Sequence, residues 1–256
     1  MRIVVLLSAG LHPVSGRTVL QRLEAQAIRL GRSLMDDAGD EILGLHAGPD
    51  PSRVADAFGY GLDRMICCRI ADGDDPVPSL SAALADLAPD LVLAGRRSQG
   101  ADETGLVPYQ VARDLGLPLA ADAAGLMRQG FRIVVDQALP KGVRRRSAIG
   151  LPALVSVHSA APPPLPFVFA AMRRGRADER PGIAAPVAPR DLEERPHRPR
   201  ARIIGQGGGS AAERLKAATE TAKAGGDVLV DPSPDEAARA VVDYLRRIGA
   251  LGPAPR

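Results

Sequence analysis

Short apolar runs alternate with amphipathic segments along the first 160 residues, and this alternation constrains the fold more than any other feature of the sequence. Runs of four to six apolar residues are typical of buried strands, whereas leucines and alanines at steps of three and four are typical of helices. Strands that alternate with helices form a parallel sheet with right-handed crossovers. We therefore expect an α/β fold with a doubly wound, mostly parallel sheet. The expected strands are 3–7, 42–45, 65–70, 91–94, 132–135 and 154–157, and the expected helices are 20–34, 53–59, 80–87 and 103–115.

The segment 90–105 joins one of these runs to a loop of small, polar and basic residues. The strand at 91–94 is followed by a helix that we expect to begin at Asp102 or Glu103. Free backbone N–H groups and the positive end of a helix favour a bound anion at such a junction. The segment is neither a P-loop nor the dinucleotide fingerprint, and a connection that binds nothing would need the same small residues for its geometry. The side-chain donors of the segment are Arg96, Arg97, Ser98 and Thr104.

A second loop, 8–17, follows the first strand and is also rich in small and basic residues. In a doubly wound sheet of order 3-2-1-4-5, strands one and four are neighbours, and ligands bind in the crevice between their loops. With that order, Ser15, Gly16 and Arg17 would face the 95–104 loop across one cleft. This convergence predicts an anionic ligand of nucleotide size. His12 could contribute, but a loop histidine before a proline is more often a turn residue.

No catalytic constellation and no metal site emerge from the sequence. The four histidines and the adjacent Cys67 and Cys68 lack the spacing of zinc ligands, and Gly-x-Ser-x-Gly does not occur. A net charge of +3 gives no case for nucleic-acid binding. No apolar run approaches the ~20 residues of a membrane span. We therefore expect a soluble, cytoplasmic chain with no catalytic residue and no metal of its own.

The character of the sequence changes after His158. Three consecutive prolines at 162–164 cannot continue a sheet, and the stretch 173–202, rich in proline and charge, predicts an extended arm. Ser233-Pro-Asp-Glu236 has the pattern of a helix capping box, and an apolar stripe after it predicts a terminal helix. The glycines at 205–209 favour a hinge over a phosphate loop. We divide the chain into an α/β domain (1–160), a loop (161–178), and a C-terminal arm with a helix (179–256).

Several short motifs follow one another in a fixed order along the domain. They are Gly59-Tyr-Gly-Leu-Asp-Arg64, Pro89-Asp-Leu-Val-Leu-Ala-Gly-Arg96, Glu103-Thr-Gly-Leu-Val-Pro108, Leu115-Gly-Leu-Pro118 and Leu151-Pro-Ala-Leu-Val155. In order and spacing they resemble the β subunits of bacterial electron transfer flavoproteins, and the resemblance covers most of the chain. The segments 12–17 and 137–142 are similar to a subgroup that serves the demethylation of N-methylated amines such as dimethylglycine.

The resemblance implies an adenine-nucleotide-binding, Rossmann-like domain in a heterodimer with an α subunit. The α subunit would hold most of the FAD, and the cleft of this chain would hold AMP or a second FAD. Electrons would arrive from a flavin dehydrogenase of the acyl-CoA or dimethylglycine type and pass to a downstream acceptor, so the chain would be a carrier and not an enzyme. The implied nucleotide contacts are Leu6, Ser8, Arg17, Ala47, Gly95, Arg96, Arg97, Ser98, Asp102, Glu103, Thr104 and Gly105.

Leu165 falls in the recognition loop of the family, which implies that it docks on the dehydrogenase. The residues alone favour packing of Leu165 beneath its own loop, whereas the resemblance favours docking. Three departures from the family pattern, at Arg17-Thr18, Arg96-Arg97 and Leu106, leave both the identity and the presence of the nucleotide open.

Two other functions use the same type of fold. An enzyme that adenylylates a substrate would carry a Ser-Gly-Gly-x-Asp-Ser loop after the first strand, and residues 8–17 lack it. A compact nucleotide sensor of the stress-protein type would not need the long segment 173–251. We therefore rank the electron carrier first.

Overall fold

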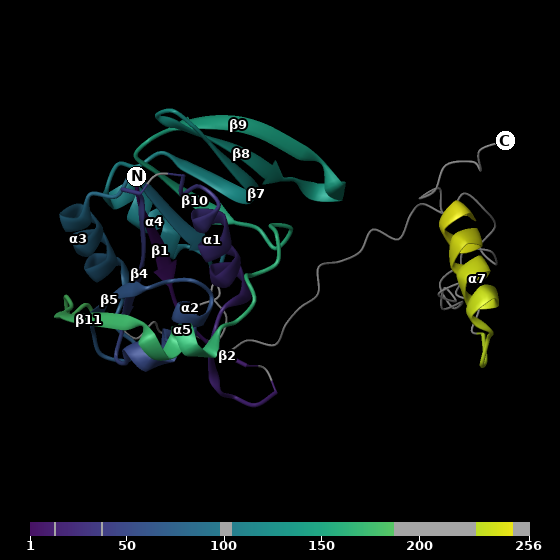
Figure 1. Ribbon diagram of the computed structural model, residues 1–256, viewed down its shortest axis with the longest axis horizontal. Helices are drawn as coiled ribbons and strands as arrows, with labels where there is room; N and C mark the ends of the chain where they lie inside the picture. The colour runs from purple at the N-terminus through teal and green to yellow at the C-terminus, as the bar shows by residue number, and fades with distance from the viewer. Residues whose placement is uncertain (13, 37, 98–103, 187–228, 248–256) are drawn as a thin grey trace, which may run out of the picture. The chain divides into compact units, whose positions relative to one another are not determined.

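The computed structural model describes residues 1–12, 14–36, 38–97, 104–186 and 229–247 of the 256-residue chain (Figure 1). The chain divides into two compact units, Met1–Asp191 and Leu192–Arg256. The first unit contains the α/β sheet, and the described part of the second unit contains one long helix.

Among the described residues, nine strands of the first unit form one sheet (Figure 1). The strand order is β11-β5-β4-β1-β6-β10-β7-β8-β9, with parallel pairing from β11 to β7 and antiparallel pairing from β7 to β9. The expected mostly parallel α/β sheet is therefore confirmed. The strands are β1 (Arg2–Leu7), β4 (Glu41–Gly48), β5 (Arg64–Arg69), β6 (Leu91–Gly95), β7 (Leu119–Gln129), β8 (Arg132–Ala138), β9 (Arg144–Gly150), β10 (Ala153–Val157) and β11 (Arg176–Pro181).

Helices cover both faces of the parallel part of the sheet, as a doubly wound fold requires. Ile28 of α1 and Phe58 of α2 belong to one aliphatic core, and Leu84 of α3 and Val111 of α4 belong to the core on the other face. The helices are α1 (Arg22–Arg32), α2 (Asp56–Gly59), α3 (Val77–Leu87), α4 (Val107–Asp114) and α5 (Phe169–Arg174), with short 3₁₀ turns η1 (Pro51–Val54) and η2 (Pro140–Gly142).

The structure adds strands that the apolar pattern did not predict. Strand β7 is rich in alanine, and β9 and β11 begin Arg-Arg-Arg and Arg-Ala-Asp-Glu-Arg. Apart from Ile149 of β9, these strands lack the β-branched residues that are typical of strands. A small hairpin of β2 (Ala9–Leu11) and β3 (Thr18–Leu20) occupies the first loop. The stretch expected to begin an extended arm at residue 173 instead contains the end of α5 and all of β11.

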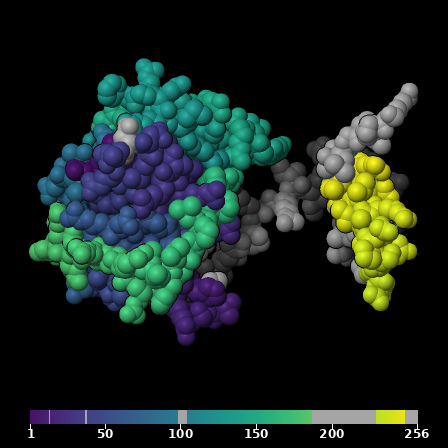
Figure 2. All heavy atoms as spheres, viewed as in Figure 1, coloured from purple at the N-terminus to yellow at the C-terminus, as the bar shows by residue number. Residues whose placement is uncertain are grey.

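The segment between β10 and β11 is tied to the surface of the same unit. Figure 2 shows this segment, in green, lying along that surface. The side-chain amide of Gln26 donates to the carbonyl of Ala161 at 2.7 Å, and the Arg29 guanidinium donates to the carbonyl of Pro163 at 2.6 Å. The Val168 N–H donates to the carbonyl of Gly59 at 2.9 Å. Helix α1 and the end of α2 therefore fix the path of this segment.

In the second unit, α7 (Pro234–Arg247) begins with the predicted capping box. The Ser233 N–H donates to the Glu236 carboxylate at 3.0 Å, and the Glu236 N–H donates back to the Ser233 hydroxyl at 3.4 Å. The apolar Val241 and Tyr244 are 58% and 46% exposed. Within the described part of the chain, none of the helices has the length and apolar character needed to cross a membrane.

Gly31 allows α1 to approach the sheet closely. A Cβ at this position would lie 2.6 Å from Ile42 Cδ1 and 3.3 Å from Leu93 Cδ1. Gly31→Val should therefore lower the free energy of unfolding by about 1–3 kcal/mol, the usual cost of overpacking a core. Chemical denaturation would measure this change. Gly39→Val is the matched control, because a Cβ at Gly39 would meet no atom within 4 Å, and equal losses for the two variants would contradict the explanation.

Candidate functional site

The carboxyl ends of β4, β1 and β6 lie side by side at one edge of the sheet. The parallel register places Leu7 opposite His46, and Val5 opposite Leu93. Four of the predicted contacts, Leu6, Ser8, Ala47 and Gly95, lie at or just beyond these strand ends and therefore share this edge. The expected neighbourhood of strands one and four is confirmed, and it forms the crevice position at which α/β sheets bind ligands.

The two described ends of the 95–105 loop lie together. Gly105 has a φ of +71°, and a Cβ there would collide with the carbonyl oxygen of Arg96. Arg96 is paired with Asp122 at 3.4 Å, whereas Arg97 is exposed. The Thr104 hydroxyl accepts a hydrogen bond from the Leu106 N–H at 3.3 Å. The other predicted contacts of this loop, Ser98, Asp102 and Glu103, lie outside the described residues.

The helix after this loop begins later than predicted. Residues 104–106 are not helical, and α4 begins at Val107 instead of at Asp102 or Glu103. Two residues explain why α4 begins at Val107. Gly105 has a left-handed conformation that a helix does not contain, and Pro108 is tolerated only in the first turn of a helix. The free N–H groups at the amino end of α4 therefore follow the loop directly.

Arg17 lies at the tip of the β2–β3 hairpin and is exposed. Its carbonyl accepts a hydrogen bond from the His12 N–H at 2.8 Å. The His12 ring nitrogen Nδ1 accepts from the N–H groups of Val14 and Ser15 at 3.4 and 3.2 Å. His12 is therefore a turn residue that closes the hairpin tip, as its place before a proline indicated.

Glu24 is a functional candidate that the sequence reading missed. It lies on α1, it is 3% exposed, and its Oε1 accepts hydrogen bonds from both the N–H (2.9 Å) and the hydroxyl (2.5 Å) of Ser8. Its Oε2 has no hydrogen-bond partner among the described residues. Burial raises the pKa of this carboxyl to about 8, although the hydrogen bonds from Ser8 oppose the shift. The sequence did contain a signal, since Glu24 shares a helix face with the buried Ile28 and Gly31.

His46, also missed, is a second buried polar residue at the same edge. It is 3% exposed, and its Nδ1 lies 2.9 Å from the carbonyl oxygen of Leu7. Its Nε2 has no partner among the described residues. Burial lowers the pKa of the imidazole, and the nearby Arg53 acts in the same direction. His46 is therefore neutral around pH 7, with the proton on Nδ1 facing the Leu7 carbonyl.

Leu165, the predicted docking residue, is half-buried on the segment that α1 holds. Its Cδ1 lies 3.3 Å from the position that a Cβ of Gly61 would take. The neighbouring Phe167 packs edge-on against Tyr60, with ring centroids 5.2 Å apart, yet Phe167 and Phe169 are 43% and 62% exposed. The segment therefore combines apolar side chains at the surface with a backbone that is fixed beneath them.

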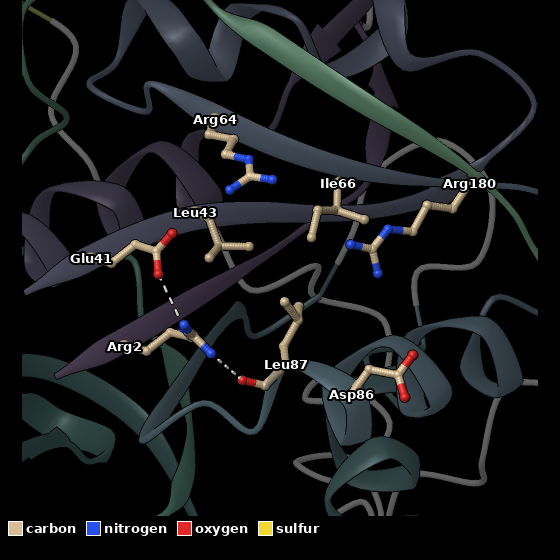
Figure 3. Close-up of a pocket in the computed structure, with 8 residues that line it drawn as sticks. All are labelled: Arg2, Glu41, Leu43, Arg64, Ile66, Asp86, Leu87 and Arg180. Carbon is tan, nitrogen blue, oxygen red and sulfur yellow. Dashed lines mark hydrogen bonds and ion pairs between the residues drawn. The ribbon is translucent and has the colours of Figure 1, made fainter.

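A cavity of about 230 Å³ lies near the opposite, amino-terminal edge of the strands (Figure 3). Arg2 donates to Glu41 at 3.0 Å and to the carbonyl of Leu87 at 2.7 Å across it. Arg64 and Arg180 also point toward the cavity (Figure 3). Because this cavity lies at the amino-terminal ends of the strands, it is separate from the crevice at their carboxyl ends. Within the described part of the chain, no group of histidine, cysteine or acidic side chains could hold a metal ion.

Comparison with known proteins identifies the family of the chain. The family model of the electron transfer flavoprotein domain matches residues 14–188. An electron transfer flavoprotein subunit beta from Chromohalobacter salexigens is 35% identical over 255 residues, which cover 96% of this chain and 94% of that protein. The family model covers more than half of the chain, and the relative aligns over nearly all of it. The chain therefore belongs to the electron transfer flavoprotein family, as a β subunit.

Proposed function

We propose that this chain pairs with an α subunit to form a heterodimer that carries electrons from a flavin dehydrogenase to a downstream acceptor. We further propose that its crevice holds one adenine nucleotide. The observation that carries the proposal is the meeting of the β4, β1 and β6 ends at one edge, with the loop that precedes α4 beside them. As a member of its family the chain is an electron-carrier subunit and not an enzyme.

The residues at the edge fit a nucleotide. Gly95 and Gly105 allow a ligand to approach the backbone, because neither has a side chain in the way. Arg97 adds an exposed positive charge, and the amino end of α4 favours a phosphate. The nucleotide would be AMP or a second FAD, whereas the electron-carrying FAD would be held mainly by the α subunit. Flavin supplies the redox chemistry, and this chain supplies position and docking.

Ser8 would contribute to the nucleotide site through its backbone position and not through a hydrogen bond from its side chain. Both of its donors, the N–H and the hydroxyl, are already engaged by Glu24. Among the described residues, we assign direct side-chain contacts with the nucleotide to Arg97 and Thr104, with Arg17 reaching from the hairpin tip. Leu6 and Ala47 would line the crevice through their backbones and small apolar surfaces.

The segment around Leu165 would dock on the dehydrogenase, of the acyl-CoA or dimethylglycine type. Support comes from the exposed apolar side chains on a backbone that hydrogen bonds hold in place. A fixed backbone presents apolar groups at low entropic cost. The exposed stripe of α7 would pack on the α subunit.

Co-expression tests the proposed assembly. The chain expressed with its α subunit should give a yellow heterodimer, because the exposed stripe of α7 needs an apolar partner. Interfaces of permanent complexes usually bury more than ~2,000 Å², so the heterodimer should survive size-exclusion chromatography at micromolar concentration. Denaturation of the purified complex should release an adenine nucleotide in addition to the FAD of the α subunit. A monomeric chain that binds FAD stably by itself would contradict the assembly.

Two substitutions test the nucleotide contacts. Arg17→Ala and Thr104→Ala should each weaken nucleotide binding tenfold or more, since a lost charge-assisted contact costs about 1.5–3 kcal/mol. Equilibrium dialysis of the heterodimer would measure the dissociation constant. Arg180→Ala is the matched control, because Arg180 is an exposed arginine at the cavity on the opposite edge. Unchanged binding in both test variants would exclude these side chains as contacts.

Leu165→Ala tests docking. The apparent KM of the dehydrogenase for the carrier should rise about tenfold, since truncation of a central apolar anchor costs about 2 kcal/mol or more. The flavin spectrum and the heterodimer should not change. Met127→Ala is the control, because Met127 is an exposed apolar residue on β7. If the melting temperature falls while electron transfer stays normal, Leu165 belongs to the packing beneath its loop.

A further inference from the structure

The peptide group between Leu7 and Ser8 is held from two sides by buried ionisable side chains. Its carbonyl faces Nδ1 of His46 at 2.9 Å, and its N–H donates to Oε1 of Glu24 at 2.9 Å. In a trans peptide the C=O and N–H groups point in opposite directions. Glu24 and His46 therefore grip one peptide from opposite sides, and we call this arrangement the peptide clamp.

The peptide clamp lies at the point where the pairing of β1 with β6 ends. Pairing of β1 with β6 reaches only Val5 opposite Leu93, while pairing with β4 continues to Leu7 opposite His46. A buried backbone N–H without a partner is costly, so the Ser8 N–H needs an acceptor other than β6. Glu24 reaches it from α1 and lies beside Gly95, where an added Cβ would come within 3.6 Å of Glu24 Cγ.

Both members of the clamp are uncharged around neutral pH. An ionised carboxylate with one buried oxygen lacking a partner would be strongly disfavoured, and the raised pKa of Glu24, about 8, agrees with this. Few charged side chains lie on the strands that pack against Glu24. Ser8 follows the last residue of β1, the exposed Arg96 and Arg97 follow β6, and β10 has no titratable side chain.

The surroundings of His46 also leave it neutral. Asp50 raises and Arg53 lowers the pKa of His46, and burial is the larger effect. The strand on its other side, β5, places Cys67 opposite His46, and burial raises the pKa of that thiol to about 12. The thiol therefore brings no charge, and the clamp fixes the strand end without placing a negative charge beside a phosphate.

We propose that Glu24 and His46 are positioning residues of the nucleotide crevice, which hold the end of β1 in the form that receives the nucleotide. This inference rests on the proposed nucleotide site. It predicts that the hydrogen-bonding ability of the two side chains, and the neutral state of Glu24, control how long the nucleotide stays bound.

Nucleotide dissociation from the purified heterodimer tests the clamp. Glu24→Met and His46→Leu remove the hydrogen bonds and should each speed dissociation about tenfold, since an unpaired buried peptide group costs about 1–3 kcal/mol. Glu24→Gln keeps an acceptor for the Ser8 N–H, and His46→Asn keeps a donor for the Leu7 carbonyl. The nucleotide should therefore dissociate from both variants within about twofold of the rate of the unsubstituted protein. Gln26→Met is the matched control, because Gln26 is a buried polar residue of the same helix that holds the 159–162 carbonyls instead of β1.

The pH profile separates positioning from general stability. Dissociation from the unsubstituted heterodimer should accelerate between pH 7 and pH 9, as Glu24 ionises through its pKa of about 8. The stability that the neutral carboxyl contributes should be complete below its unfolded pKa of 4.5 and should be lost as the pH rises to about 8. Glu24→Gln should flatten both profiles, and this variant keeps the test valid even if Glu24→Met does not fold.

The outcomes distinguish this inference from the proposed function. An unsubstituted heterodimer without a nucleotide in the crevice would overturn both. A nucleotide that leaves Glu24→Met, His46→Leu and the unsubstituted protein at the same rate would overturn only the clamp. Equal acceleration in Gln26→Met would also overturn it, because the effect would then follow from loss of stability.

Discussion

The unequal pairing of β1 with its two neighbours is the constraint on which the rest of the crevice depends. Strand β4 follows β1 to its last residue, whereas β6 leaves it two residues earlier. The part of β1 that β6 leaves unpaired lies where we propose that the nucleotide binds, and its backbone groups need other hydrogen-bond partners. Side chains of α1 and β4 supply those partners. The same few residues therefore border the unpaired end of β1 and satisfy its backbone hydrogen bonds.

Helix α1 connects this edge with the surface segment that follows β10. Within two turns, the helix contributes Glu24 to the crevice, and Gln26 and Arg29 to the carbonyls of 159–163. Gly31 holds the helix against the sheet at close range. A shift of α1 would therefore move both the end of β1, where we propose that the nucleotide binds, and the segment that carries Leu165, because a close-packed core transmits displacement.

The sequence predicted the parts of the fold that depend on apolar patterning. Strands β1, β4, β5, β6, β8 and β10 follow from their apolar runs. The order 3-2-1-4, expected from a doubly wound fold, is confirmed, but β10 and not the expected fifth strand, β8, lies next to β6, because β8 pairs antiparallel with β7. Strands β7, β9 and β11 were missed because their alanine-rich or charged sequences lack the apolar pattern of a buried strand, although they pair within the sheet. The start of α4 was misplaced because Gly105 and Pro108 govern it locally. Glu24 and His46 were missed because polar residues within apolar stripes reveal their partners only in three dimensions.

The two outermost strands of the sheet limit how the protein can associate. Strand β11 carries Asp178, Glu179 and Arg180, and β9 begins with three arginines, most of which are exposed. Charged side chains on an edge strand discourage another chain from adding a strand to the sheet. The sheet is thereby protected at both ends against edge-to-edge aggregation. Side-chain surfaces are therefore favoured over strand addition for a long-lived assembly of this chain.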